Sequence, residues 1–309
     1  MLVVIALGGN ALLRRGQALT PEAQRRNVAK AAEAIAEITS EHRIVVTHGN
    51  GPQVGLLAEQ SPSACNDARF ALDLLGAETQ GMIGYIIESE LASRLPRTEI
   101  ATLITQAVVD PSDPAFRVPT KPIGRIYAQS EIRRLEADFG WKFADEGNGF
   151  RRVVPSPMPR HIREINAIRL LVAAGVLVIC AGGGGIPVAI DEGSGAIVGI
   201  EAVVDKDRSA ALLAIELKAD ALLMLTDVPC VCTEWGSTRA RGIRQATPTG
   251  LRRYHFLEGS MGPKVEAASA FVTDTGGIAA IGALGDASSM LKGEAGTYIT
   301  TTGPDLTWY

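Results

Sequence analysis

Cysteine is scarce in this chain of 309 residues, which has only Cys65, Cys180, Cys230 and Cys232. Four irregularly spaced cysteines cannot form a disulfide framework in a chain of this length, so we expect reduced thiols. Cys230 and Cys232 stand two residues apart and lack the spacing and the further ligands that a zinc site needs. We therefore predict no metal site built from protein side chains alone.

Long apolar runs are also missing, and aromatic residues make up only 5% of the chain. The longest apolar stretch, residues 170–181, has 12 residues, whereas a membrane-spanning helix needs about 20. No basic segment precedes the first apolar run, so a signal peptide is not expected. The formal charge of −4 gives no overall attraction to nucleic acid or anionic membranes. We expect a cytoplasmic protein that binds neither.

The sequence does contain a repeated order of apolar strand, glycine turn and helix. The runs Leu2–Leu7 and Ile44–Thr47 have strand length, and glycines follow each of them. Thr20 before Pro21 predicts the start of a helix, and a second helix is expected from Gln53. Further strands of the same kind are expected at Val176–Ala181, Ala221–Thr226 and Ile278–Leu284. This alternation predicts an α/β protein with a mainly parallel sheet between helices, whose turns share the carboxyl edge where ligands bind.

The pattern changes between Asp113 and Pro159, where six prolines bracket a basic and partly aromatic segment. We interpret residues 117–158 as a small protruding subdomain inserted within a single domain of residues 1–309. Because proline fixes φ, the crossing points would be stiff, and the insert could move as a body over the sheet edge. Lys121 lies between two of these prolines and is either aimed inward or an ordinary surface lysine.

Three glycine-rich turns follow expected strands. They are Gly8-Gly9-Asn10, Gly49-Asn50-Gly51 and Gly182-Gly183-Gly184. Backbone N–H groups at helix N-termini suit phosphate or carboxylate oxygens, and absent side chains allow a close approach, so we predict an anion site where the turns meet. Neither the P-loop pattern nor GxGxxG occurs in these turns, which disfavours P-loop enzymes and dinucleotide-dependent oxidoreductases.

The lysines for such a site must come from elsewhere, and Lys206 and Lys264 stand at expected helix starts. A cation in the first turn of a helix opposes the helix dipole at a cost of typically ~0.3 to 1 kcal/mol, so this placement indicates an anionic ligand. Asp207 would then hold the two ammonium groups in register rather than act as a base. The alternative is a pair of solvated surface lysines.

Two further polar residues end strands at the same edge. His48 could act as a general base, but a turn histidine is more often a hydrogen-bonding scaffold, and we assign it no catalysis. Asp227 follows the strand Ala221–Thr226. A hydrogen bond from Asp227 to ribose or adenine and a simple capping role both remain open.

The ensemble resembles the carbamate kinases of the amino-acid-kinase family, from about Val3 to Thr297. Seven ordered blocks carry the resemblance: residues 6–12, 48–55, 113–116 with 119–124, 151–157, 182–187, 205–207 and 259–264. The stretches Pro119–Gly124 and Gly259–Lys264 resemble carbamate kinases in particular. The resemblance implies a three-layer αβα sandwich with a protruding lid, a homodimer, and Mg²⁺-dependent phosphoryl transfer between ATP and carbamate, giving ADP and carbamoyl phosphate.

The resemblance also implies the roles of individual residues. The catalytic residues would be Lys121, Lys206, Asp207 and Lys264. The carbamate or carbamoyl phosphate site would be formed by Gly8, Gly9, Asn10, Gly49, Asn50 and Gly51. The nucleotide site would be formed by Gly182, Gly183, Gly184, Asp227, Met261, Gly262 and Lys264, with Mg²⁺ held mainly by nucleotide phosphates and water.

One position departs from the wider family. Related kinases for acetylglutamate or uridylate usually carry a lysine where this chain has Ala6, and the resemblance implies that Lys121 supplies that charge from the lid. Two alternatives stay open, a kinase for another small acid and a catalytically silent nucleotide-binding sensor. The direction of the reaction also stays open, including ATP formation from carbamoyl phosphate.

Overall fold

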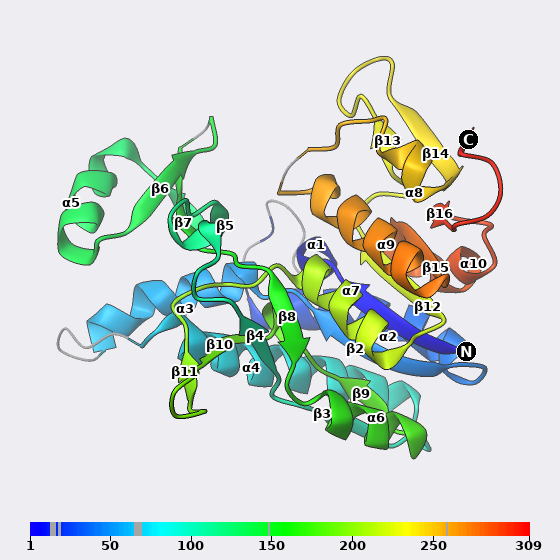
Figure 1. Cartoon of the computed structure of the whole chain (residues 1–309), viewed down its shortest axis with the longest axis horizontal. Coiled ribbons are helices and arrows are strands. Elements are labelled where there is room, and N and C mark those ends of the chain that lie inside the picture. The colour runs from blue at the N-terminus through cyan, green and yellow to red at the C-terminus, as the bar shows by residue number, and fades with distance from the viewer. Residues whose placement is uncertain (13–16, 18–19, 65–69, 148, 258) are drawn as a thin grey trace.

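A ten-stranded sheet runs through the middle of the protein (Figure 1). The computed structural model describes residues 1–309 apart from 13–16, 18–19, 65–69, 148 and 258, and without the side chains of residues 10, 11 and 61–64. In spatial order the strands are β13 (Cys232–Thr233), β14 (Arg241–Ala246), β16 (Thr297–Ile299), β15 (Ile278–Ala283), β12 (Ala221–Thr226), β1 (Leu2–Leu7), β2 (Arg43–His48), β9 (Leu177–Ile179) and β3 (Ile100–Thr102), with β17 (Leu306–Trp308) beside β14. The neighbours from β15 through to β3 are all parallel, which confirms the mainly parallel sheet.

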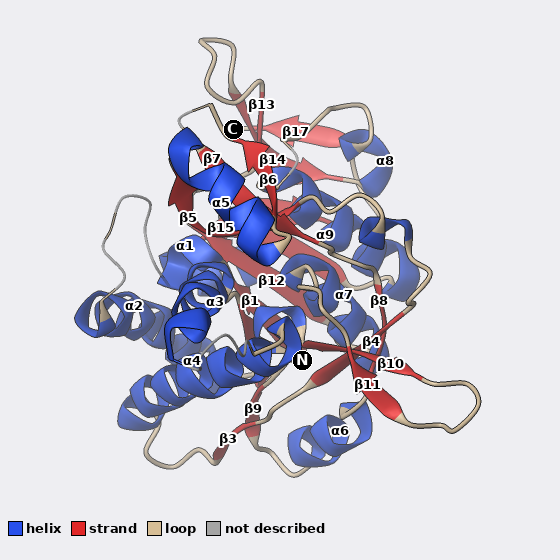
Figure 2. Ribbon diagram, turned by 90° about the vertical axis from the view of Figure 1, so that its left-hand side faces the viewer, coloured by secondary structure: helices blue, strands red, loops and turns tan. Residues whose placement is uncertain are grey.

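Helices cover both faces of this sheet and complete three layers. One face packs against α2 (Pro21–Thr39), α4 (Leu72–Arg94) and α10 (Ala287–Leu291), and the other against α6 (Ile165–Ala173), α7 (Lys206–Leu217) and α9 (Met261–Thr275). Figure 2 shows α2 and α4 on one side of the sheet and α7 on the other. Alternate side chains of a strand point to opposite faces, so Val3 and Ile5 enter the first core while Val4 and Ala6 enter the second.

The remaining elements lie around these layers. They include the four-residue helices α1 (Gly9–Leu12) and α8 (Pro248–Leu251) and the 14-residue helix α3 (Gly51–Ala64). Single 3₁₀ turns are η1 (Pro114–Phe116), η2 (Gly182–Gly184) and η3 (Leu284–Asp286). A separate four-stranded sheet has the order β11 (Ile197–Gly199), β10 (Ile186–Ile190), β4 (Gln106–Val109) and β8 (Pro159–Ile162).

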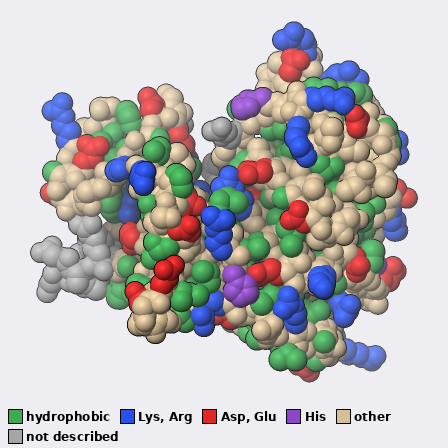
Figure 3. Space-filling model, in the orientation of Figure 1, with side chains coloured by type: hydrophobic (Ala, Val, Ile, Leu, Met, Phe, Trp, Pro, Cys, Tyr) green, Lys and Arg blue, Asp and Glu red, His purple; other side chains and the backbone are tan. Residues whose placement is uncertain are grey.

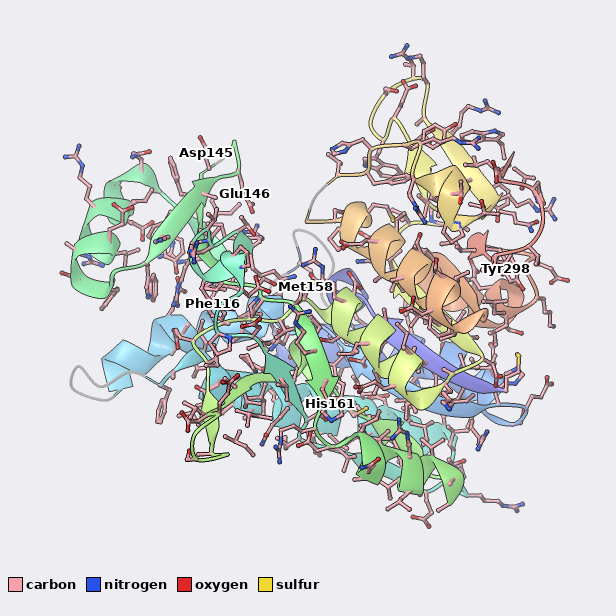
Figure 4. The ribbon with its side chains drawn as sticks, in the orientation of Figure 1. Phe116, Asp145, Glu146, Met158, His161 and Tyr298 are labelled. Atoms are coloured by element: carbon pink, nitrogen blue, oxygen red, sulfur yellow. The ribbon has the colours of Figure 1, made fainter. Side chains whose placement is uncertain are left out.

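Residues 117–158, called the lid from here on, protrude from the body of the protein (Figure 1). The lid holds α5 (Gln129–Phe139) and an antiparallel sheet of β5 (Lys121–Tyr127), β7 (Phe150–Val154) and β6 (Lys142–Asp145). In Figure 4, Asp145 and Glu146 lie at its far end, whereas Phe116 and Met158 lie at its base. The Asp113 carboxylate accepts hydrogen bonds from the N–H groups of Ala115 (2.9 Å) and Met158 (3.0 Å), which ties the two crossing segments together.

The expected element boundaries are close to the observed ones, with small corrections. Thr20 does cap α2, because its hydroxyl accepts a hydrogen bond from the N–H of Ala23 at 3.2 Å. The helix expected from Gln53 begins two residues earlier, at Gly51, since the Asn50 carbonyl accepts the first helical hydrogen bonds. The strand expected at Val176–Ala181 is shorter because its last residues turn into η2.

Candidate functional site

Two lysines from two different helices meet on one carboxylate. Asp207, in the first turn of α7, accepts a hydrogen bond from Lys206 Nζ at 2.6 Å on Oδ1 and one from Lys264 Nζ at 2.9 Å on Oδ2. The three side chains are only 6 to 13% exposed. The surface-lysine alternative is therefore wrong for both residues. The structure brings the two ammonium groups together at the N-termini of α7 and α9.

The charges in this cluster are strongly coupled. Burial disfavours ionisation of Asp207, but the two ammonium groups outweigh it, and the pKa of Asp207 lies below its ordinary value. The pKa of Lys206 is raised because its attraction to Asp207 exceeds the effect of its burial. The pKa of Lys264 is lowered by burial and by the neighbouring Lys206. An additional anion beside Lys264 would oppose both of these effects.

The lid contributes a third ammonium group. Lys121, the first residue of β5, donates a hydrogen bond to the Asp205 carboxylate at the N-terminus of α7. Three ammonium groups thus accompany two carboxylates, and one positive charge is in excess. On the face shown in Figure 3, a notch separates the lid from the rest of the protein, and Lys and Arg side chains gather along its lower edge. The arrangement is suited to a multiply charged anion.

The first two glycine turns lie beside this cluster, but two of the N–H groups expected to bind an anion donate to backbone carbonyls instead. The N–H of Gly8 donates to the Leu225 carbonyl (2.8 Å) and that of Gly49 to the Leu7 carbonyl (3.2 Å), so neither is available to a ligand. A Cβ on Gly49 would lie 3.2 Å from Lys206 Cδ, which shows that Gly49 makes room for that side chain.

Gly9 and Gly51 have a different environment. A Cβ at either position would meet none of the described atoms within 4 Å. Gly51 opens the 14-residue helix α3, whose next residue, Pro52, has no N–H, and whose Gln53 N–H donates to the Asn50 carbonyl at 2.9 Å. Asn10 lies in α1, and its side chain is outside the described part of the chain. Open space at Gly51, together with its backbone N–H at the helix start, fits the approach of an oxygen anion.

The third glycine turn packs against the second one. A Cβ on Gly183, whose φ is +67°, would lie 2.2 Å from Asn50 Nδ2, and one on Gly182 would lie 2.4 Å from the His48 ring. Asn50 in turn donates to Thr79 Oγ1 at 2.9 Å, a partner that sequence reasoning missed. The turn therefore supports Asn50 and His48. Its expected contact with the nucleotide stays a prediction, as does that of Gly184, whose carbonyl accepts from Ser209 Oγ at 2.6 Å.

His48 is a scaffold residue. It is 1% exposed, its Nδ1 lies 3.0 Å from the Gly49 carbonyl oxygen, and burial lowers its pKa from 6.5 to about 4. The imidazole is therefore neutral at physiological pH, and the expectation that it takes no part in catalysis stays a prediction.

Asp227 lines a cavity at the end of β12. The cavity measures about 720 Å³ and is bounded by α2 and by the turn after β15. Met261 and Gly262 form the first turn of α9, ahead of Lys264, and do not line this cavity. A shared contact of Asp227 and the start of α9 with one nucleotide stays a prediction.

Three of the four cysteines, Cys180, Cys230 and Cys232, are free thiols, and Cys65 lies outside the described residues. Among the described residues, no three His, Cys, Asp or Glu side chains are arranged to hold a metal ion. Nor is any helix in the described part long and apolar enough to cross a membrane.

Comparison with known proteins agrees with this geometry. The model of the Amino acid kinase family matches residues 1–281. The carbamate kinase of Rhizobium meliloti is 51% identical over 100% of this chain and 96% of its own length, and that of Haemophilus influenzae is 48% identical over 100% of both chains. The structure of carbamate kinase from Giardia lamblia bound to AMP-PNP is 39% identical, with a TM-score of 0.88 over 96% of this chain and 98% of that one. The chain therefore belongs to the amino acid kinase family and, within it, to the carbamate kinases, which makes it a phosphotransferase.

Proposed function

We propose that the lysine cluster transfers a phosphoryl group reversibly between ATP and carbamate, giving ADP and carbamoyl phosphate. The observation that carries the proposal is the buried Asp207 carboxylate shared by Lys206 and Lys264, with Lys121 reaching the same helix end. A carbamate oxygen would attack the γ-phosphorus in line with the leaving ADP oxygen.

This reaction needs positive charge rather than a base. Carbamate is already an anion, so no proton has to leave the nucleophile, and a neutral, buried His48 is no obstacle. The difficulty is repulsion, because two unit charges 4 Å apart interact by about 4 kcal/mol at an effective dielectric near 20, or about three powers of ten in rate. Lys206 and Lys264 would neutralise the transferred phosphoryl group and the leaving oxygen, and Lys121 would add its charge from the lid.

We place the two substrates on either side of these lysines. Carbamate or carbamoyl phosphate would occupy the open space beside Gly9, Asn10 and Gly51, with Gly8, Gly49 and Asn50 shaping its wall. The nucleotide would lie toward Met261, Gly262 and Lys264 and extend toward Asp227. The turn Gly182–Gly184 would support the acceptor side through Asn50.

We propose that Mg²⁺ enters with the nucleotide. Both carboxylates of the cluster, Asp205 and Asp207, are already paired with ammonium groups, so they do not form a separate cage. Mg²⁺ commonly keeps several waters and binds through phosphates, which fits a site with few protein ligands. When bound, the ion would neutralise charge on the nucleotide phosphates.

We also propose a homodimer formed through α4 of a cytoplasmic protein. Leu74, Met82 and Tyr85 on this helix are 50%, 40% and 61% exposed, which leaves an apolar surface in need of a partner. Light scattering should give the mass of two chains for the unmodified protein and of one chain for Tyr85→Lys. Leu170→Lys on α6, at a residue 74% exposed, is the matched control and should remain a dimer.

One assay tests the activity: the purified chain is mixed with carbamoyl phosphate, ADP and Mg²⁺, and ATP is measured. ATP formation supports the proposal. Nucleotide binding without turnover would instead favour a silent sensor. Phosphorylation of acetylglutamate, glutamate, aspartate or uridylate in preference to carbamate would favour another kinase of small acids.

A further inference from the structure

Asp205 is the residue through which the lid touches the lysine cluster, and its two carboxylate oxygens have separate partners. Oδ1 accepts hydrogen bonds from the backbone N–H groups of Asp207 (2.9 Å) and Arg208 (3.3 Å), which caps α7. Oδ2 accepts the hydrogen bond from Lys121 Nζ. One buried carboxylate therefore fixes the start of α7 and the end of the Lys121 side chain at the same time.

The contact with Asp205 places the Lys121 ammonium group at the N-terminus of α7, next to the lysine cluster. The Asp205 carboxylate also attracts the ammonium groups of Lys206 and Lys264, so an ammonium group held by Asp205 stays beside theirs. An ammonium group has three N–H donors, and a lysine that gives one to Asp205 keeps others for a phosphoryl oxygen. The Lys121 side chain is 29% exposed, whereas that of Asp205 is 11% exposed, so the lysine retains access to solvent and to a ligand.

Contacts with α3 hold the rest of β5 in place, independently of Asp205. Glu59 of α3 pairs with Arg125 Nε at 2.9 Å and accepts a hydrogen bond from the Tyr127 hydroxyl, and β5 approaches α3 closely at Gly55 and Gly124. These contacts position the middle of β5, and pairing with Val154 of β7 positions the backbone of its first residue, which leaves the tip of the Lys121 side chain to be directed by Asp205. Loss of the Asp205 charge would thus release the Lys121 tip without detaching the lid.

We propose that Asp205 is a positioning residue: it holds the Lys121 ammonium group at the N-terminus of α7 before substrates arrive, so that the lid enters the reaction with its charge already in place. The consequence for catalysis rests on the proposed function, in which Lys121 acts on the transferred phosphoryl group. The contact itself does not depend on that function and can be tested separately.

Asp205→Asn separates the two roles of the carboxylate. Asparagine caps helices about as well as aspartate, so α7 keeps its cap, while the charge that attracts Lys121 is lost. Turnover should fall about 10- to 100-fold, whereas KM for carbamoyl phosphate should stay unchanged or fall, because one negative charge is removed beside an anion. Asp191→Asn, which changes an exposed carboxylate that caps a surface turn outside the lid, should keep both values.

A double-mutant cycle shows whether Asp205 acts through Lys121. Lys121→Ala combined with Asp205→Asn should be no slower than Lys121→Ala alone, because the positioned group is already gone. Additive losses would overturn the proposal, and so would a raised KM with unchanged turnover in Asp205→Asn.

Chemical labelling tests the contact without any turnover. Acetic anhydride should acetylate Lys121 of the substrate-free protein more slowly than the exposed Lys142 of the same lid, as read by mass spectrometry. In Asp205→Asn the Lys121 rate should rise several-fold while that of Lys142 stays constant. An unchanged Lys121 rate would refute the positioning contact. A protein that passes this test but makes no ATP would refute only the proposed function.

Discussion

Replacing Asp207 by asparagine perturbs the lysine cluster with little change in volume. The substitution removes the charge that Lys206 and Lys264 share at 2.6 and 2.9 Å. At an effective dielectric near 20, each attraction amounts to roughly 6 kcal/mol before the cost of burial is subtracted. Removal of one partner from a buried ion pair destabilises a protein by about 3 to 5 kcal/mol, because the remaining charge is uncompensated. We expect a loss of stability of that size.

The same substitution should change the pH dependence of turnover. The pKa of Lys264 already lies below its ordinary value because of burial and the neighbouring Lys206, and without Asp207 it falls further. A lysine with a lower pKa loses its proton at lower pH, so the high-pH limb of the kcat profile should move to lower pH. Near neutral pH, turnover should fall by about two orders of magnitude or more.

Initial rates of ATP formation between about pH 6 and pH 9 would give the profile, and denaturant unfolding would give the stability. Asp191→Asn, at an exposed carboxylate that caps a surface turn, is the control and should match the unmodified protein. Turnover within a few-fold of the unmodified protein with an unshifted high-pH limb would refute the idea that Asp207 keeps the two ammonium groups charged and in place.

Three further predictions concern single residues. Lys206→Ala and Lys264→Ala should each lower turnover by about two orders of magnitude or more, and near-normal turnover in a folded variant would remove that residue from the mechanism. Lys121→Ala should lose turnover while ADP binding, followed by calorimetry, survives; unchanged turnover would make the lid lysine incidental. Because the unfolded chain protonates His48 near pH 6.5 and the folded chain only near 4, stability should fall by about 3 kcal/mol as pH drops across that interval. His48→Gln should lose this dependence in urea unfolding, and equal pH dependence in both proteins would refute it.

Local signals in the sequence were sufficient for the central layers. The continuous apolar run Leu2–Leu7 is β1, and Ala221–Thr226 is β12, residue for residue, because a strand covered on both faces leaves an unbroken apolar pattern. The four-stranded sheet could not be predicted from local sequence signals. It joins residues 106–109, 159–162, 186–190 and 197–199, and pairing between segments so far apart leaves no periodicity that marks it.

The site also has features that local sequence signals identify and features that depend on long-range pairing. Lysines at helix starts are visible in sequence, and both were predicted to meet on Asp207. The use of the Gly8 and Gly49 N–H groups by neighbouring strands was not visible, because it depends on the pairing of β1 with β12 and β2. The sequence analysis gives Asp205 no role of its own, although an aspartate directly ahead of a helix start is a capping signal that could have identified it.

The position of Ala6 bears on why the proposed function takes its third charge from the lid. Ala6 is 1% exposed and belongs to the same core as Val204 and Ala210, so its side chain lies on the sheet face that α7 covers. A lysine at this position, as the resemblance implies for related kinases, would approach from within the sheet the helix end that Lys121 reaches from outside. A charge fixed on β1 would be present in every state of the protein, whereas a charge on β5 depends on where the lid stands. Under the proposed function, the third ammonium group is therefore the one whose place would change with the substrate, and Asp205 would decide where it rests beforehand.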